Sequence, residues 1–161
     1  MWNISRRFNG HNLRSMEINA VLGISQLKNL DANNSVRRKN FNRFITMVEK
    51  YPKFFHANYQ VEGNCSFCLP FVCKNSKIKE KLESFLQTSG VETRPLCSGN
   101  LLRQPFLRNM KEMPSADQYP HVEFLHESGF FIGNNHLITD QEFLTLECLV
   151  KEWVDTESRG E

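Results

Sequence analysis

Three short stretches of the sequence combine arginine or asparagine with glycine or proline. They are Gly10-His-Asn-Leu-Arg14, Glu92-Thr-Arg-Pro95 and Gly133-Asn-Asn-His136. A guanidinium binds phosphate or carboxylate through two parallel hydrogen bonds, and an asparagine amide donates to phosphate oxygens. These stretches therefore indicate sites for an anionic ligand. The structural alternative is that Arg14 pairs with Glu17, Arg94 lies in solvent at a strand end, and Asn134-Asn135 forms a turn.

The cysteines raise the question of a metal or redox site. Cys65, Cys68 and Cys73 begin with a C-x-x-C pattern, but a zinc ribbon needs a second ligand pair, and Cys97 and Cys148 are isolated. Residues 65–73 are typical of a buried strand, on which positions three apart face opposite ways. We therefore favour small buried side chains over metal ligands. No Ser/His/Asp set, paired carboxylates or ligand spacing among the histidines is recognisable, so the sequence assigns no catalytic residue and no metal.

The composition is that of an ordinary globular chain of 161 residues, with 40% hydrophobic and 24% charged residues. No apolar run approaches the length of a membrane span, and no secretory signal is recognisable, so we expect no membrane partner and a cytoplasmic location. Residues 1–43 hold eight Lys and Arg against two acidic residues. Such an excess is also typical of a basic module that binds nucleic acid, which is the alternative function.

Helical patterns dominate the first third of the chain. Residues 15–30 are apolar around most of the helix circumference, which predicts a helix buried on more than one side. A turn is expected at residues 31–34, followed by a second helix over residues 35–51 that Pro52 ends.

Short strands then alternate with helices. We expect strands at residues 65–73, 91–96 and 130–133. The helices between them are expected to begin at a Ser76 cap and at Tyr119-Pro120, and Gly90 closes the first of them. Thr139-Asp-Gln-Glu142 has the form of a capping box and predicts a last helix to residue 154. The fold class is α/β: two helices, then a small three-stranded sheet with packed helices.

The site-like stretches also resemble a known family. The run from Gly10 to Asp31, GHNLRSMEINAVLGISQLKNLD, is similar to a segment of the DegT/DnrJ/StrS family, whose members are fold-type I, pyridoxal-phosphate-dependent sugar aminotransferases and their dehydratase relatives. Residues 90–95 and 99–105 resemble the subgroup of nucleotide-sugar 3-dehydratases and lipopolysaccharide-biosynthesis enzymes, and residues 129–134 fit the same C-terminal region. The resemblance covers residues 8–154.

The resemblance implies a partial enzyme. The chain is similar to the linking helices and the small C-terminal domain of a fold-type I aminotransferase, and the large cofactor-binding domain, with its Schiff-base lysine or the histidine of the dehydratases, is absent. We therefore expect inter-domain and dimer-interface helices at residues 1–52, a small C-terminal α/β domain at residues 53–155 and a frayed tail at residues 156–161. We expect a fragment that is inactive alone and binds no cofactor alone.

The same resemblance assigns roles to four residues. Asn12 matches the asparagine that reaches the cofactor phosphate in the neighbouring subunit, and Arg14 matches an arginine directed to the anionic ligands of that shared site. Arg94 would point toward the substrate or amino donor, and His11 stands on the substrate side, where Tyr or Phe is common. The full-length enzyme would be a homodimer that uses pyridoxal or pyridoxamine phosphate on a 4-keto nucleotide sugar, with no nucleic-acid partner. The stretch at residues 99–105 favours a 3-dehydratase over an aminotransferase.

Overall fold

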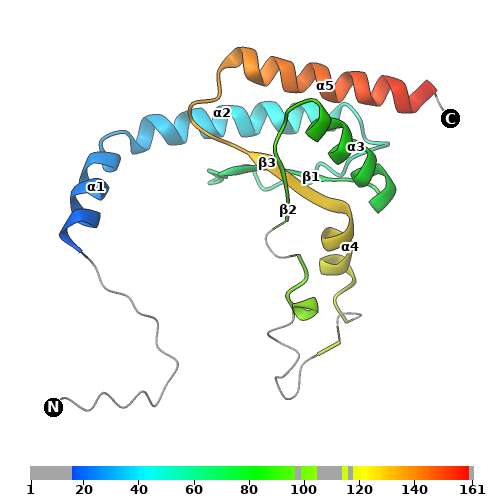
Figure 1. The fold of residues 1–161 in the computed structure, drawn as a ribbon, viewed down its shortest axis with the longest axis horizontal. Helices are drawn as coiled ribbons and strands as arrows, with labels where there is room; N and C mark the ends of the chain where they lie inside the picture. Colours follow the sequence, from blue (N-terminus) through cyan, green and yellow to red (C-terminus); the bar gives the residue numbers. More distant parts are fainter. Residues whose placement is uncertain (1–15, 97–98, 105–113, 116–117, 160–161) are drawn as a thin grey trace. The chain divides into compact units, whose positions relative to one another are not determined.

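The computed structural model describes residues 16–96, 99–104, 114–115 and 118–159 (Figure 1). His11, Asn12 and Arg14 lie outside these residues. The chain divides into two compact units between Asn33 and Asn34. The predicted grouping of residues 1–52 and 53–155 stays a prediction.

Helix α1 (Glu17–Leu27) is an apolar helix with no buried residue. The sequence predicted burial on more than one side, whereas Val21 is 66% exposed and the other large apolar residues are similarly exposed: Met16, Ile18, Leu22, Ile24 and Leu27. The described residues of this chain therefore do not bury α1, and its predicted role as an inter-domain and dimer-interface helix stays a prediction. The physical reason is that the described residues of the smaller unit include no second layer of structure that covers the helix.

Helix α2 (Leu30–Glu49) begins earlier than predicted and runs through the expected turn at residues 31–34. That segment contains neither Gly nor Pro, and Asp31 in the first turn places a carboxylate at the positive end of the helix dipole. The helix therefore continues without a break until its second half enters the core. Its buried residues are Asn40, Phe41, Phe44, Ile45, Met47 and Val48.

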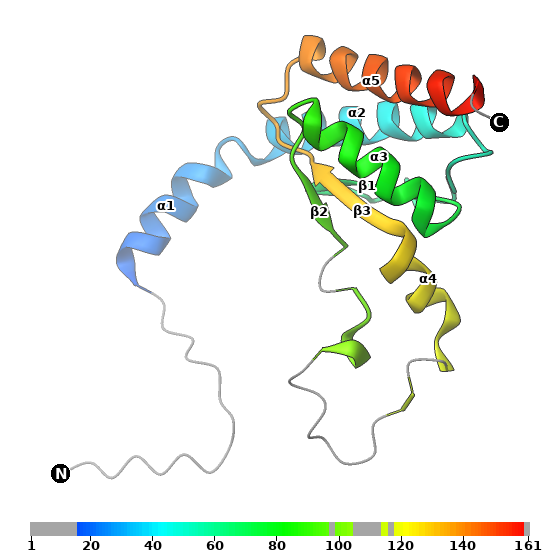
Figure 2. The same cartoon turned by 45° about the vertical axis from the view of Figure 1, so that its right-hand side comes forward.

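The sheet has three antiparallel strands in the order β1-β3-β2. They are β1 (Cys68–Val72), β2 (Thr93–Pro95) and β3 (Gly129–Gly133), so the predicted three-stranded sheet is confirmed with shorter first and second strands. Alternate residues of β1 and β3 are buried on one face, over which α2, α3 and α5 lie (Figures 1 and 2). The inward residues are Leu69, Phe71, Phe130 and Ile132.

The remaining helices are α3 (Ser76–Thr88), the short 3₁₀ helix η1 (Leu101–Arg103), α4 (Pro120–Ser128) and α5 (Asp140–Arg159). Two local predictions need correction. The cap of α3 is Asn75, whose side chain accepts from the Ile78 amide, and not Ser76. Helix α5 does not end at residue 154 but continues to Arg159, where Lys81 of α3 holds Glu157 at 2.5 Å.

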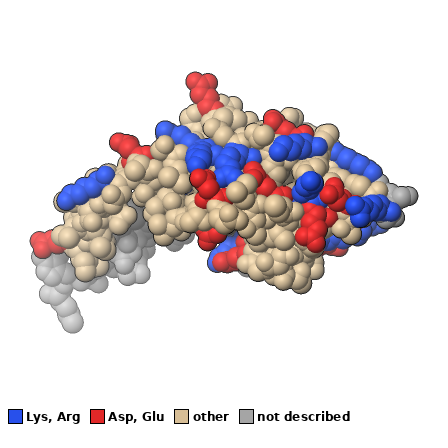
Figure 3. Space-filling view, turned by 90° about the horizontal axis from the view of Figure 1, so that it is seen from above, with Lys and Arg blue, Asp and Glu red and all other residues tan. Residues whose placement is uncertain are grey.

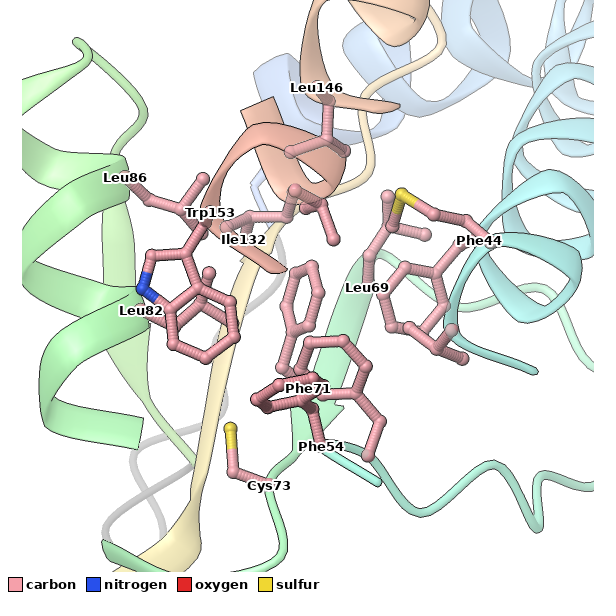
Figure 4. Packing of buried hydrophobic residues seen from close by; sticks show 14 of the residues in the cluster. Phe44, Phe54, Leu69, Phe71, Cys73, Leu82, Leu86, Ile132, Leu146 and Trp153 are labelled. Carbon is pink, nitrogen blue, oxygen red and sulfur yellow. The ribbon is translucent and has the colours of Figure 1, made fainter. Parts of the chain in front are cut away.

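Aromatic rings form much of the core between the sheet and the helices that cover it. Figure 4 shows side chains of α2, α3, α5 and the strands converging on one cluster. The ring of Phe71 stacks on Phe130 with 5.0 Å between centroids and meets Phe44 edge-on at 4.9 Å. Each additional buried ring of this size contributes apolar area that drives folding.

The capping box of α5 allows a pH-resolved prediction. The Thr139 amide and hydroxyl both donate to Glu142 at 2.8 Å, and these bonds lower the pKa of Glu142 below its ordinary value. A carboxylate with a lowered pKa in the folded state stabilises the fold at pH values above its unfolded pKa, and this contribution is lost as the pH falls through the folded pKa. We expect Thr139→Ala to cost about 1 kcal/mol in the free energy of unfolding at neutral pH, measured by urea denaturation.

The difference between Thr139→Ala and the unmodified chain should shrink when the titration is repeated below the ordinary glutamate pKa of about 4.3. Thr145→Ala is the matched control, because the exposed Thr145 hydroxyl bonds only the Gln141 carbonyl within the helix. A difference that is constant with pH would contradict the reciprocal bond between Thr139 and Glu142.

Candidate functional site

Arg94 is the described member of the predicted ligand-binding set. It lies in the edge strand β2 opposite Phe131, on the face of the sheet away from the core. Its Nε and Nη2 donate to Glu92 Oε1 at 2.9 and 2.6 Å, and both side chains are well exposed. An exposed pair of this kind contributes about 0–1 kcal/mol, so an anionic ligand that offers a second carboxylate or a phosphate can displace Glu92.

The Gly133–His136 stretch has a structural role at its centre. Asn134 is 1% exposed, and its Nδ2 donates to the carbonyls of Arg37 at 3.0 Å and Ser66 at 2.9 Å. Its Oδ1 accepts from Asn40 Nδ2 at 3.3 Å. This asparagine therefore joins β3, α2 and the segment before β1, and it is not available to a ligand.

A second polar cluster was not predicted from the sequence. It joins η1 and the loop before it to α4, through Asn100, Arg103, Glu123 and His126. Asn100 is 1% exposed, and its side chain donates to Glu123 Oε2 at 2.9 Å. The sequence signal that could have indicated it is the glycine at position 99, next to Asn100. Glycine readily adopts a positive φ, and the φ of 61° at Gly99 forms a tight turn.

The cysteines behave in part as predicted. Cys73 is buried, and burial raises the pKa of its thiol to about 12, which keeps it protonated and unreactive. Cys65 and Cys68 are only half-buried, and Cys65 Sγ lies 3.2 Å from Asn34 Oδ1. Within the described part of the chain, no three His, Cys, Asp or Glu side chains are grouped as metal ligands.

The basic residues of α2 are partly neutralised by α5. Lys39 Nζ and Arg43 Nη1 contact Asp140 at 2.8 and 2.9 Å, and Arg43 Nη2 contacts Glu147 at 3.2 Å. Over this part of the surface, acidic and basic side chains are interspersed rather than separated (Figure 3). A nucleic-acid interface needs a continuous basic stripe, and these ion pairs interrupt one.

A groove of about 640 Å³ opens between the sheet and the first half of α5. Its lining is largely apolar, with Leu69, Ile132, Phe143, Leu146 and Leu149 among its residues. The charged groups in it are the carboxylates of Glu92 and Glu142, which disfavour an anionic ligand. None of the helices in the described ranges is both long enough and apolar enough to cross a bilayer.

Comparison with known proteins gives one family. The sequence profile of the DegT/DnrJ/EryC1/StrS aminotransferase family matches residues 2–144. Among curated relatives, GDP-4-keto-6-deoxy-D-mannose 3-dehydratase of Escherichia coli O55:H7 is 28% identical over 130 residues, which are 80% of this chain and 33% of that enzyme. The enzyme of the same name from Yersinia pseudotuberculosis is 25% identical over 145 residues, which are 89% of this chain and 37% of its own length. The chain thus spans about a third of these relatives.

Solved structures show the same partial match. The E. coli GDP-4-keto-6-deoxy-D-mannose 3-dehydratase with bound hydrated pyridoxal phosphate superimposes with a TM-score of 0.76 at 26% identity. The match covers 88% of this chain and 37% of that structure. An aminotransferase from Psychrobacter cryohalolentis gives a TM-score of 0.80 at 15% identity, over 97% of this chain and 43% of its own, and shows the likeness of fold alone.

Proposed function

Because the chain belongs to the DegT/DnrJ/EryC1/StrS aminotransferase family, we propose that it is the C-terminal portion of an enzyme that acts on 4-keto-6-deoxy nucleotide sugars with pyridoxal or pyridoxamine phosphate. The observation that carries the proposal is the partial superposition: 88% of the chain matches 37% of a 3-dehydratase that holds this cofactor. The relatives are thus about three times as long as the segment that they share with this chain. From the family resemblance, we propose further that the chain alone is inactive and that the full-length enzyme is a cytoplasmic homodimer.

The cofactor supplies an electron sink for bond changes next to its imine carbon, and the protein positions the substrate against it. The amide of Asn134 is committed to the carbonyls of Arg37 and Ser66, so it does not hold the cofactor. By the family resemblance, we propose that Asn12 and Arg14 make the phosphate contacts. His11 and Arg94 serve the substrate side.

Within the family, we propose a 3-dehydratase rather than an aminotransferase. Two observations support this choice. Both curated relatives described above are 3-dehydratases, and the stretch at residues 99–105 resembles that subgroup. In the structure, Asn100 and Arg103 of this stretch donate hydrogen bonds to Glu123 of α4. These side-chain contacts fix the conformation of the stretch.

A fusion enzyme tests the proposal. This chain would replace the matching C-terminal third of the E. coli 3-dehydratase, behind that enzyme's own N-terminal part. We expect the fusion to bind pyridoxal phosphate and to consume GDP-4-keto-6-deoxy-D-mannose, whereas the chain alone shows neither cofactor absorbance nor turnover. A folded, cofactor-loaded fusion that neither dehydrates nor transaminates the nucleotide sugar would overturn the proposed substrate class.

In the same fusion, Arg14→Ala should weaken cofactor binding about ten- to a hundredfold, because it removes a charge-assisted hydrogen bond. Arg38→Ala is the matched control, since Arg38 is an exposed residue of α2. Equal cofactor affinities for the two variants would exclude Arg14 from the phosphate site.

A further inference from the structure

His126 of α4 is fitted against the loop that precedes η1. Its Nδ1 accepts the backbone N–H of Asn100 at 3.2 Å. The backbone of Gly99 lies so close that a Cβ built there would overlap the imidazole ring. Glycine at this position therefore serves two needs, the positive φ of the turn and the close approach of the ring.

Two side chains extend this contact along one face of α4. Asn100 Oδ1 accepts from the Leu102 amide at 3.0 Å, and its Nδ2 donates to Glu123. Arg103 Nε donates to the same Glu123 oxygen at 3.1 Å, and Nη2 lies 3.5 Å from Glu127. Glu123, His126 and Glu127 are three and four residues apart, so they share one helix face, and the segment 99–103 is held along it.

We propose that His126 is a pH-sensitive contact that positions residues 99–103. Only the neutral ring with its proton on Nε2 offers Nδ1 as an acceptor to the Asn100 amide. When solvent delivers a proton to Nδ1, both nitrogens become donors, and the Asn100 N–H then faces another N–H. The bond is therefore present at higher pH and lost on acidification, and residues 99–103 lose one of their contacts with α4.

The charges around His126 come from few groups. Those of η1 and of α4 itself are Arg103, which pairs with both Glu123 and Glu127, and the exposed His121. On α3, which also packs against α4, Lys81 pairs with Glu157 and Glu83 accepts from Thr93. Lys77 and Glu80 are exposed, and Lys79 is half-buried and interacts electrostatically with Cys73. His56 contacts Phe124, and its Nδ1 lies 3.3 Å from Lys74 Nζ, so this imidazole interacts with groups other than His126.

Nuclear magnetic resonance on the full chain tests the proposal. Long-range proton–nitrogen spectra should show His126 with its proton on Nε2 at neutral pH. Amide exchange should show the Asn100 and Leu102 protons protected there, and acidification should reduce their protection factors about three- to tenfold, the value of one hydrogen bond. The amide of Val150, in the core, should keep its protection and report that the fold is intact.

His126→Asn separates the titration from the hydrogen bond. An asparagine Oδ1 stands where Nδ1 stands in histidine and accepts without titrating, so this variant should keep the Asn100 amide protected at both pH values. His121→Asn, at an exposed position of the same helix, should behave as the unmodified chain. A proton on Nδ1 at neutral pH, or loss of protection on acidification in His126→Asn as well, would overturn the proposal. The test needs only the fold, so it is independent of the proposed function.

Discussion

Replacing Phe71 with alanine is expected to lower the free energy of unfolding by about 3–5 kcal/mol, the cost of a cavity left by a buried ring. Phe71 is completely buried at the centre of the aromatic cluster. Its ring is 5.0 Å from Phe130, 4.9 Å from Phe44 and 5.7 Å from Phe55, so three further rings lose a partner. Because whole domains are stable by only about 5–15 kcal/mol, the variant should be close to unfolding. Urea denaturation followed by circular dichroism measures the change.

Two variants keep this prediction testable if Phe71→Ala does not fold. Phe71→Leu retains most of the apolar volume and should cost less than about 1.5 kcal/mol. Phe67→Ala is the matched control, since Phe67 precedes the same strand but is 60% exposed, and we expect a change within about 1 kcal/mol. Equal losses for Phe67→Ala and Phe71→Ala would show that the cluster around Phe71 is not the core.

Asn134→Ala is expected to cost about 3–5 kcal/mol, because each buried polar group left without a partner costs about 1–3 kcal/mol. The substitution removes two donors, to the carbonyls of Arg37 and Ser66, and the acceptor for Asn40. Asn40 is itself buried, so its side-chain amide cannot form a replacement hydrogen bond with water. The same urea titration measures the loss.

The neighbouring Asn135 supplies the control for Asn134. Asn135 is exposed, and its Oδ1 accepts only the Leu137 amide two residues on. Asn135→Ala should therefore change the free energy of unfolding by less than about 1 kcal/mol. If Asn134→Ala were as mild as Asn135→Ala, the buried hydrogen bonds between β3 and α2 would contribute little to stability.

The elements that the sequence predicts well are those with local causes. The Thr139–Glu142 box and the positive φ of Gly90 at the end of α3 each depend on residues within one turn of the chain. The predicted turn at residues 31–34 failed because the helix penalty of Asp and Asn is small, about 0.7 kcal/mol per residue or less. Packing of the later part of α2 in the core outweighs it.

The contacts of the candidate site also divide into local ones, which spacing can predict, and long-range ones, which it cannot. Glu92 and Arg94 are two residues apart on an extended chain, so they share a face, and this spacing could have predicted their pairing although the structural alternative placed Arg94 in solvent. The Asn100–His126 and Arg37–Asn134 bonds join residues 26 and 97 positions apart. No periodicity marks such partners, because they meet only after the sheet and helices have formed.

The exposed apolar residues of α1 distinguish selection for folding from selection for some other property of the chain. In this chain, burial of Val21 or Ile24 contributes little to folding, because both side chains remain mostly in water. A polar residue at either position would leave the free energy of unfolding nearly unchanged, whereas a polar residue at Phe71 would abolish the fold. Selection for a folded chain alone therefore acts on the sheet and leaves α1 free to drift, so any constraint on its apolar character must come from a requirement other than folding of the described residues.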